Sequence, residues 1–437
     1  MNYKNANEFE QKLIQYRRDF HKYAEARWVE FRTSSKVAQV LSELGYDVLV
    51  GLDIIVPEEC IGRPKEDLIE QEQKRAVNQG ADPFWLKKMQ GYTGVVGILK
   101  TKNPGPVTAF RFDIDALNNI EAKEKGHRPY DEGFVSVNEG YMHACGHDGH
   151  TAIGLGLAEV LMKMRDELCG TIKLFFQPSE EGGGGARAMV ASGIADDVNY
   201  LFTGHIGLAH NGVPLNSHSI AGGCNDFLDN RRYDITFIGK AAHPCGDPHK
   251  GKNALLAACT AALNIHAIAP HGEGLSRVNV GVLNAGVSRN TIAPTAFLQI
   301  EARGDSDETA EYMEQRVLCI IKSTAQMYGL EYETKFMGST PSAKSDKELV
   351  DVVLKTASTI EWFKEFHGEG NVGGSDDASE WMRKVQSNGG KATYIGLGAD
   401  FAASFHNNYF DFDEGVLMPS VELFYKLAKE VCEKSEK

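Results

Sequence analysis

The order of apolar and polar residues divides the first part of the chain into helices and short strands. Apolar residues recur at helical spacing over 7–23 and 34–45, which predicts two amphipathic helices. Runs of β-branched and aromatic residues bounded by Gly and Pro predict strands at 93–99 and 107–112. The highly charged stretch 57–91 is expected to be a surface insertion of one or two helices.

Helix and strand then alternate, and polar residues gather where strands end. The pattern predicts a helix over 153–168, strands at 172–176, 198–202 and 392–397, and a last helix over about 414–433. In open α/β sheets, ligands bind at the edge where the carboxyl ends of the strands meet. The sequence therefore predicts a layered α/β domain with its site at that edge.

A different pattern interrupts this domain. Residues 222–337 predict the order strand, helix, strand, strand, helix, strand, with elements at 233–238, 253–269, 278–283, 296–302, 306–328 and 332–336. This β-α-β-β-α-β order is that of a ferredoxin-like module. We therefore divide the chain into a catalytic domain built from 1–221 and 338–437 and a module inserted at 222–337.

The composition fits this plan of two domains. A chain of 437 residues exceeds what one core usually serves, and 42% hydrophobic with 24% charged residues is ordinary for a globular protein. The formal net charge of −14 disfavours nucleic acid or an anionic membrane as a partner. The sequence shows neither a signal peptide nor a membrane-spanning run, and its eight cysteines are scattered without disulfide-like clustering. We therefore expect a cytoplasmic protein.

The stretch Met142–His150 carries the densest chemistry in the chain, with three histidines, one cysteine and one aspartate. An apolar core has little use for so many hydrogen-bonding groups, whereas a metal site does. Cys145 and His147 flank a single glycine, and thiolate with imidazole suits zinc and other transition metals. Asp148 is expected to accept a hydrogen bond from a ligating imidazole. The alternative is a polar loop that caps the following helix.

Further candidate ligands stand at three other places. Glu180 and Glu181 follow a predicted strand and precede four glycines, and adjacent like charges are costly to hold together unless a cation lies between them. His205 and His406 follow two other predicted strands. Glu180 could move a proton between water and the leaving nitrogen. Five candidate ligands suit two cations: Cys145, His147, Glu181, His205 and His406.

Two other chemistries fit the sequence less well. A serine hydrolase of the Gly-x-Ser-x-Gly type requires that turn after a strand, and the sequence contains none. A nucleophilic Cys145 with a neighbouring histidine is conceivable, but it leaves the Glu180–Glu181 pair without a role. Asp113 and Asp115 end a predicted strand, where they either face the site or cap a turn.

These residues lie within longer runs that resemble a known family. Over nearly its whole length the chain is similar to the dinuclear metal amidohydrolases and exopeptidases that include carboxypeptidase G and the bacterial and plant N-acyl-amino-acid amidohydrolases. The similarity implies a zinc-exopeptidase-like layered α/β catalytic domain with the inserted ferredoxin-like (α+β) module as a lid and dimerisation domain. It is carried by the runs 17–21, 28–32, 127–130, 142–156, 265–270, 277–281 and 410–414.

The resemblance also implies roles for individual residues. Glu180 matches the general acid/base, and His243 matches a lid histidine that reaches the neighbouring subunit's site and stabilises the oxyanion. Asn290 and Arg303 match residues that contact the substrate's glutamate, with Arg303 gripping a carboxylate. Five positions match the ligands of two divalent ions per protomer, Mn²⁺ or Zn²⁺: Cys145 (the expected bridge), His147, Glu181, His205 and His406.

The function that the resemblance implies is metal-dependent hydrolysis of the amide bond of an N-acyl or N-aroyl amino acid. The specific expectation is cleavage of p-aminobenzoyl-glutamate to p-aminobenzoate and glutamate. The alternatives are a general N-acyl-amino-acid deacylase or dipeptidase, and a non-catalytic metal-binding subunit. The expected assembly is a homodimer or a heterodimer with a homologous subunit. The chain departs from the pattern it resembles within 404–408 and at Pro244 and Cys245, and these differences are expected to alter the substrate pocket rather than the ligand set.

Overall fold

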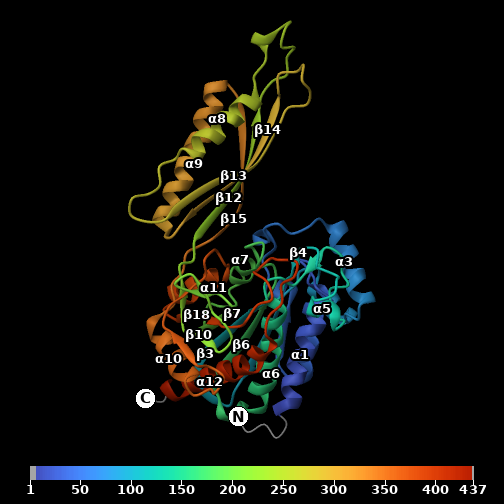
Figure 1. The fold of residues 1–437 in the computed structure, drawn as a ribbon, viewed down its shortest axis with the longest axis vertical. Helices are drawn as coiled ribbons and strands as arrows, with labels where there is room; N and C mark the ends of the chain where they lie inside the picture. Colours follow the sequence, from blue (N-terminus) through green and yellow to red (C-terminus); the bar gives the residue numbers. More distant parts are fainter. Residues whose placement is uncertain (1–5, 436–437) are drawn as a thin grey trace. The chain divides into compact units, whose positions relative to one another are not determined.

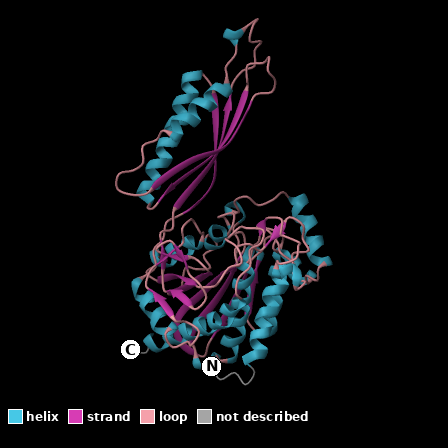
Figure 2. Ribbon diagram, viewed as in Figure 1, coloured by secondary structure: helices cyan, strands magenta, loops and turns pink. Residues whose placement is uncertain are grey.

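The fold is that of a computed structural model of the chain, which describes residues 6–435. The chain forms two compact units, coloured along the sequence in Figure 1 and by element type in Figure 2. Unit 1 comprises Met1–Asn225 and Ala343–Lys437, and unit 2 comprises Asp226–Ser342. Within the described residues, none of the helices combines the length and apolar character that a membrane span requires.

Unit 1 is built on an eight-stranded mixed sheet of order β1-β2-β6-β3-β7-β18-β10-β16. The four central strands β6, β3, β7 and β18 run parallel, so their carboxyl ends meet at one edge. The strands are β1 (Asp47–Val50), β2 (Val95–Lys100), β3 (Asn103–Asp113), β6 (Cys169–Gln177), β7 (Tyr200–Ile206), β10 (Ser219–Ala221), β16 (Glu365–His367) and β18 (Lys391–Leu397).

Helices cover both faces of this sheet. One layer contains α1 (Ala6–Lys22), α2 (Phe31–Leu44), α6 (His147–Lys163), α10 (Lys347–Ala357) and α12 (Leu417–Ser435), with α6 and α12 directly on β3. The other contains α7 (Gly185–Val190) and α11 (Ala378–Ser387), which contact each other and lie on β6, β7 and β18. Alternation along β3 serves both layers, because Phe110 and Phe112 meet Phe424 of α12 while Arg111 between them binds Asp377 beside α11.

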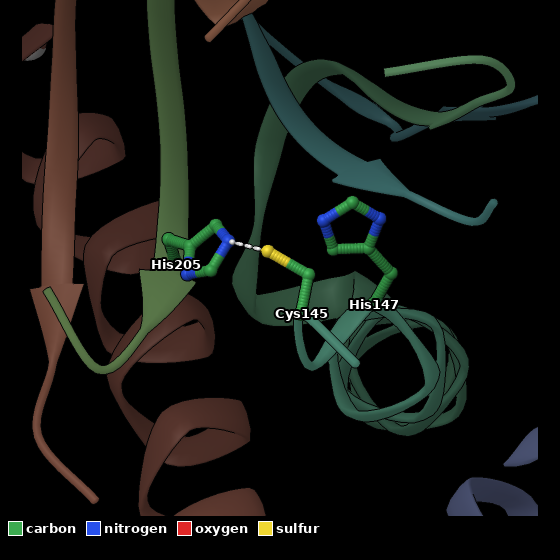
Figure 3. Close-up of side chains that lie close together, drawn as sticks. All are labelled: Cys145, His147 and His205. Carbon is green, nitrogen blue, oxygen red and sulfur yellow. Dashed lines mark hydrogen bonds between the residues drawn. The ribbon is translucent and has the colours of Figure 1, made fainter. Parts of the chain in front are cut away.

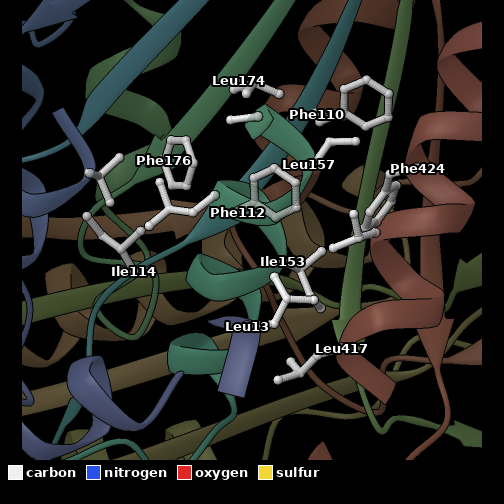
Figure 4. Close-up of a cluster of buried hydrophobic side chains, with 14 of the residues drawn as sticks. Leu13, Phe110, Phe112, Ile114, Ile153, Leu157, Leu174, Phe176, Leu417 and Phe424 are labelled. Atoms are coloured by element: carbon white, nitrogen blue, oxygen red, sulfur yellow. The ribbon is translucent and has the colours of Figure 1, made fainter. Parts of the chain in front are cut away.

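The main apolar core lies between β3, β6, α1, α6 and α12 (Figure 4). Helix α6 lies so close to the sheet that a Cβ on Gly154 would be 2.6 Å from the Phe176 ring. The close approach places the start of α6 beside the carboxyl ends of the strands. The labelled side chains of this core are Leu13, Phe110, Phe112, Ile114, Ile153, Leu157, Leu174, Phe176, Leu417 and Phe424.

The charged stretch 57–91 contains two helices, as predicted, but it is more than a surface insertion. The helices are α3 (Glu66–Asn78) and α4 (Pro83–Met89). Ile69 and Trp85 are buried in the main core, and Arg75 donates to Glu25 at 2.8 Å, which fastens α3 to the start of unit 1. The shorter elements of unit 1 are β4 (Leu117–Asn118), α5 (Arg128–Asp131), β5 (Tyr141–Met142), β8 (Ala209–His210), β9 (Val213–Pro214), β11 (Cys224–Asn225) and β17 (Gly370–Asn371).

Unit 2 has the predicted element order β-α-β-β-α-β of a ferredoxin-like module. Its sheet is antiparallel, with the order β13-β14-β12-β15. Both helices pack on this sheet around a separate core that includes Phe237, Leu298 and Ile321. The elements are β12 (Asp229–Ile238), α8 (Ala254–His266), β13 (Ser276–Ala285), β14 (Thr295–Gly304), α9 (Asp307–Tyr328) and β15 (Glu331–Thr340).

Three local features differ from the sequence-based expectations. Helix α6 begins at His147 rather than near 153, because Gly146 takes a left-handed conformation with φ +90° and starts the helix early. Strand β7 extends to Ile206, so His205 lies in the strand rather than after it. Cys169 and Cys432 form a disulfide with their Cα atoms 5.5 Å apart, a pairing that their separation of 263 residues did not reveal.

Candidate metal centre

The candidate ligands of unit 1 meet at the carboxyl edge of the parallel strands. Glu181 follows β6, and His205 lies near the end of β7. Cys145 is separated from α6 by Gly146 alone, and His147 is the first residue of that helix. His406 belongs to the long segment between β18 and α12, where its backbone N–H donates to Ala144 O at 2.8 Å. Elements distant in the sequence therefore converge on one place.

The donor atoms of these five residues form two overlapping groups. In each group all atoms lie within 4.8 Å of one another, the first containing Cys145, His147 and His205 and the second Cys145, Glu181 and His406. The Cys145 sulfur lies 3.5 Å from His205 Nε2, between two imidazole rings (Figure 3). Since Cys145 belongs to both groups, one thiolate could contact two cations.

Two buried polar atoms in this cluster lack a hydrogen-bond partner among the described residues. They are His147 Nε2 and Glu181 Oε1. Burial of an unpaired polar atom is costly, whereas a cation would satisfy both atoms. The combination of thiol, imidazole and carboxylate donors is also the one that zinc and related transition metals accept. The residues present therefore fit a metal site.

Backbone carbonyls orient two of the imidazoles for this purpose. His147 Nδ1 lies 2.9 Å from the Asp115 carbonyl oxygen, and His205 Nδ1 lies 2.8 Å from the carbonyl oxygen of Ile206. A carbonyl only accepts, so each Nδ1 carries the proton and each Nε2 presents its lone pair to the cluster. This is the arrangement that ligating histidines generally adopt.

Asp115 organises the site from behind. Its carboxylate accepts from the backbone N–H groups of Glu180 at 3.0 Å and Glu181 at 3.1 Å, and its carbonyl holds His147. Its neighbour Asp113 lies 2.5 Å from His150 Nδ1 and accepts from Arg111 at 2.6 Å. Asp113 Oδ1 also lies 3.8 Å from His147 Nε2, so both strand-end aspartates face the candidate ligands.

Asp148 has a different partner from the one expected. Its carboxylate accepts from Arg17 Nε at 2.8 Å and lies 2.8 Å from His21 Nδ1, rather than holding a ligating imidazole. His21 in turn lies 2.8 Å from Glu121. Although burial lowers it, hydrogen bonds to Asp148 and Glu121 raise the pKa of His21 to about 9. Asp148 therefore ties the start of α6 to α1, because Arg17 and His21 both belong to that helix.

Burial and neighbouring charges shift the pKa values of the cluster. Burial raises the pKa of the Cys145 thiol, and Glu181 raises it further. Burial also raises the pKa of Glu181 to about 7, although His147 opposes the shift. Burial, with a smaller effect of His150, lowers the pKa of His205, which keeps this imidazole neutral. A divalent cation would counter the raised values, because it stabilises thiolate and carboxylate strongly.

Glu180 belongs to a carboxylate group that the sequence reasoning did not assemble. Oxygen atoms of Glu180, Asp376 and Asp377 lie within 4.8 Å of one another. Burial, followed by the nearby Asp376 and Glu181 carboxylates, raises the pKa of Glu180 well above its ordinary value. Arg111 donates to Asp377 at 2.9 Å and offsets part of this negative charge. In the sequence this place stands out only as the turn-forming run Gly373-Gly374-Ser375-Asp376-Asp377.

The remaining predicted site residues lie in unit 2. His243 is exposed, and its Nδ1 accepts from the backbone N–H groups of Cys245 at 3.2 Å and Gly246 at 3.0 Å. Asn290 is exposed and accepts from Ser288 Oγ at 3.0 Å. The half-buried Arg303 donates to Glu301 at 2.5 Å. All three side chains therefore bond to near neighbours in the sequence.

Comparison with known proteins places this site in a family. Residues 109–430 match Peptidase family M20/M25/M40. The chain is 45% identical over 412 residues to an indole-3-acetyl-aspartic acid hydrolase of Enterobacter agglomerans, covering 94% of this chain and 93% of that protein. It is also 45% identical over 424 residues to one of the subunits of p-aminobenzoyl-glutamate hydrolase from Escherichia coli, covering 97% of this chain and 96% of that protein.

Solved structures agree with the sequence matches. The crystal structure of an aminobenzoyl-glutamate utilization protein from Klebsiella pneumoniae matches with a TM-score of 0.82 and 39% identity, covering 97% of each chain. A dinuclear metal-binding M20 peptidase of Bacillus subtilis has the same fold, with a TM-score of 0.70 at 24% identity and coverage of 98% and 99%. The chain therefore belongs to peptidase family M20/M25/M40.

Proposed function

We propose that the protein is a two-metal hydrolase that cleaves the amide bond of an N-acyl or N-aroyl amino acid. The observation that carries this proposal is the pair of overlapping donor groups that share the Cys145 sulfur. The residues that would hold two divalent ions, Mn²⁺ or Zn²⁺, are Cys145, His147, Glu181, His205 and His406, and Cys145 belongs to both donor groups. When bound, the ions supply Lewis-acid activation of water and of the scissile carbonyl.

Glu180 is the proposed general acid and base. It lies next to the proposed ligand Glu181, and one of its oxygens lies 3.9 Å from His147 Nε2. Its carboxylate would take a proton from the attacking water and return it to the leaving nitrogen. The hydrogen bond from its backbone N–H to Asp115 fixes the turn that carries it.

The substrate follows from the relatives and from the predicted contacts in unit 2. Both relatives with 45% identity are named for hydrolysis of an aromatic acyl group joined to an acidic amino acid. Asn290 and Arg303 would bind a carboxylate of that amino acid, and the guanidinium would supply a charge-assisted hydrogen bond. We therefore take p-aminobenzoyl-glutamate as the first substrate to test, with general N-acyl-amino-acid deacylation as the alternative.

His243 is the proposed donor to the oxyanion. Two backbone N–H groups occupy its Nδ1, so the proton of the neutral ring sits on Nε2, where it can be donated. We propose that it serves the site of a second copy or of a homologous chain. In support, α8 exposes Leu256 and Leu263, at 48% and 74%, on a helix that contacts the edge strand β13. An apolar helix face beside an open sheet edge suits an isologous contact.

A nucleophilic cysteine is the one alternative chemistry with geometric support. The Cys145 sulfur lies 3.5 Å from His205 Nε2, which is the pairing that a thiol nucleophile requires. That role leaves Glu181 and His406 unexplained, although their donor atoms lie in the same group as the sulfur. The ligand role uses all of these atoms.

Metal content and turnover test the proposal together. The protein is stripped with a chelator, reloaded with Mn²⁺ or Zn²⁺, and assayed on p-aminobenzoyl-glutamate, indole-3-acetyl-aspartate, hippurate and acetyl-amino acids. We expect about two ions per chain and turnover that depends on them. Full activity in the metal-free protein would overturn the two-metal mechanism and favour the thiol nucleophile.

The proposal includes a cytoplasmic location, which rests on the scattered cysteines. In a reducing cytoplasm Cys169 and Cys432 would be thiols, although the structure pairs them. Alkylation of freshly lysed cells under denaturing conditions, followed by mass spectrometry, reports their state. A disulfide present at lysis would contradict the cytoplasmic location.

A further inference from the structure

A pocket of about 620 Å³ opens on unit 1 beside the candidate metal centre. His406 forms part of its wall, and His406 Nε2 lies 3.5 Å from Glu181 on the other side. The pocket therefore adjoins the place where a scissile carbonyl would lie. Its lining is Asn118, Asn119, Ile120, Gly140, His406, Asn407 and Asn408.

The two walls of the pocket are joined to each other and to the metal loop. Asn119 Nδ2 donates to His406 O at 3.0 Å, and the Ala122 N–H donates to Asn408 O at 2.9 Å. The His406 N–H donates to Ala144 O at 2.8 Å, next to Cys145. These bonds give the pocket a defined shape and fix its position relative to the proposed ligands.

The chemistry of the lining is polar but, apart from His406, uncharged. Asn119 and Asn407 use their side-chain oxygens for the backbone N–H groups of Ile120 at 2.8 Å and Tyr409 at 2.9 Å. The carboxamides of Asn118 and Asn408 make no hydrogen bond to any described residue. Ile120 is 72% exposed and supplies an apolar surface beside them. The pocket therefore offers an apolar wall and two free carboxamides.

This lining suits one side of the proposed substrate better than the other. An acidic leaving amino acid carries two carboxylates, which need cations, and the lining offers neither lysine nor arginine. The acyl side is uncharged, and an aromatic acyl group has an apolar face and can carry an N–H donor at its edge. A carboxamide oxygen accepts such a donor.

We propose that this pocket is the subsite for the acyl group and that Asn118 and Asn408 recognise an N–H donor on an aromatic ring. The inference rests on the proposed function and deepens it, because it names the residues that select the acyl group. Asn118 and Asn408 are exposed, so water satisfies their carboxamides when an analogue without the N–H binds, and the preference equals the net value of a hydrogen bond.

The test uses two substrates that differ by one amino group, p-aminobenzoyl-glutamate and benzoyl-glutamate, with acetyl-glutamate as a third. For the metal-loaded protein we expect kcat/KM to favour the aminobenzoyl substrate by about two- to tenfold. Asn118→Leu and Asn408→Leu should bring that ratio close to one by lowering only the aminobenzoyl value. The matched control is Asn216→Leu, which replaces an exposed asparagine of unit 1 outside the pocket and should keep the wild-type ratio.

Ligand-observed NMR with 4-aminobenzamide and benzamide separates the subsite from the proposed reaction. We expect the wild-type protein to bind 4-aminobenzamide more tightly and both pocket variants to lose that preference. An unchanged selectivity ratio in both variants, or an equal loss on all three substrates, would overturn the subsite. Absence of turnover by the metal-loaded wild-type protein would overturn the proposed function instead. The amide titration would then decide the pocket alone, and equal binding of both amides would refute it.

Discussion

The proposed site residues of unit 1 and unit 2 differ in how the protein holds them. In unit 1 the ligand cluster is backed by buried charges, since Asp113, Asp115 and Asp148 each bind groups from other elements. In unit 2, His243 and Asn290 are exposed and bond to near neighbours in the sequence. The difference indicates that the fold of unit 1 preorganises its candidate site. In unit 2 the side-chain hydrogen bonds of His243 and Asn290 stay within their own loops.

The largest effect is expected from substitution of Glu180, the proposed general base in unit 1. Glu180→Gln should lower kcat by about 10²–10⁴-fold, because proton transfer is lost while the ligands remain. Metal analysis should show wild-type ion content. Glu181→Gln is the matched control, since it should lose metal as well as activity. A fully metallated Glu180→Gln protein with unchanged kcat would remove this residue from the mechanism.

The buried charges behind the cluster should matter for stability. Arg17 is fully buried and pairs with Asp148, Asp411 and Glu414. Arg17→Met would leave these carboxylates without their partner, so we expect the free energy of unfolding to fall by about 3–5 kcal/mol in urea. Lys102 pairs with Asp166 at the surface, and Lys102→Met should change it by less than about 1 kcal/mol. Equal effects would show that the buried network is not what holds α1 to the metal loop.

Mixing of two inactive variants tests the proposed role of the exposed His243 in unit 2. His243→Ala should lower kcat by about 10²–10³-fold, because an oxyanion donor is lost. Mixed with Glu180→Gln under conditions that exchange protomers, it should form dimers in which one site has both residues intact. Activity should then recover to a sizeable fraction of wild type. Demonstrated exchange without recovery would mean that His243 does not serve a neighbouring chain's site.

The pH dependence of stability should report His21. Its pKa is raised to about 9 from an ordinary 6.5, since hydrogen bonds to Asp148 and Glu121 outweigh burial and the nearby Arg17. Protonated His21 therefore stabilises the folded state. This stabilisation is fully present below the pKa of His21 in the unfolded chain, and it is lost as the pH rises toward 9. The free energy of unfolding of the metal-free protein should fall by roughly 3 kcal/mol between pH 6 and 9.

The matched variant for the pH experiment is His21→Gln, which keeps hydrogen-bonding capacity but cannot titrate. It should be less stable than wild type at pH 6 and should show a flatter dependence on pH. If wild type and His21→Gln lose the same free energy over this range, another group controls the titration.

The sequence could identify most residues of the candidate site because their chemistry is concentrated in short runs. The Cys/His run and the Glu180–Glu181 pair are unusual at the level of neighbouring residues, and both proved to lie at one sheet edge. The partner of Asp148 could not be predicted, because Arg17 and His21 lie more than a hundred residues away and look like an ordinary helix surface. The Glu180, Asp376 and Asp377 group was missed for the same reason.

The sequence by itself determined the order of elements, the insertion of a β-α-β-β-α-β module and the residue types that could hold two cations. Those properties follow from periodicity and from side-chain chemistry, which act locally. Tertiary structure alone decided that Asp148 pairs with Arg17 and His21, that Asp115 holds the Glu180–Glu181 turn, and that an asparagine-lined pocket adjoins His406. These depend on the register of parallel strands and on the approach of α6, through which long-range packing brings distant residues within bonding distance.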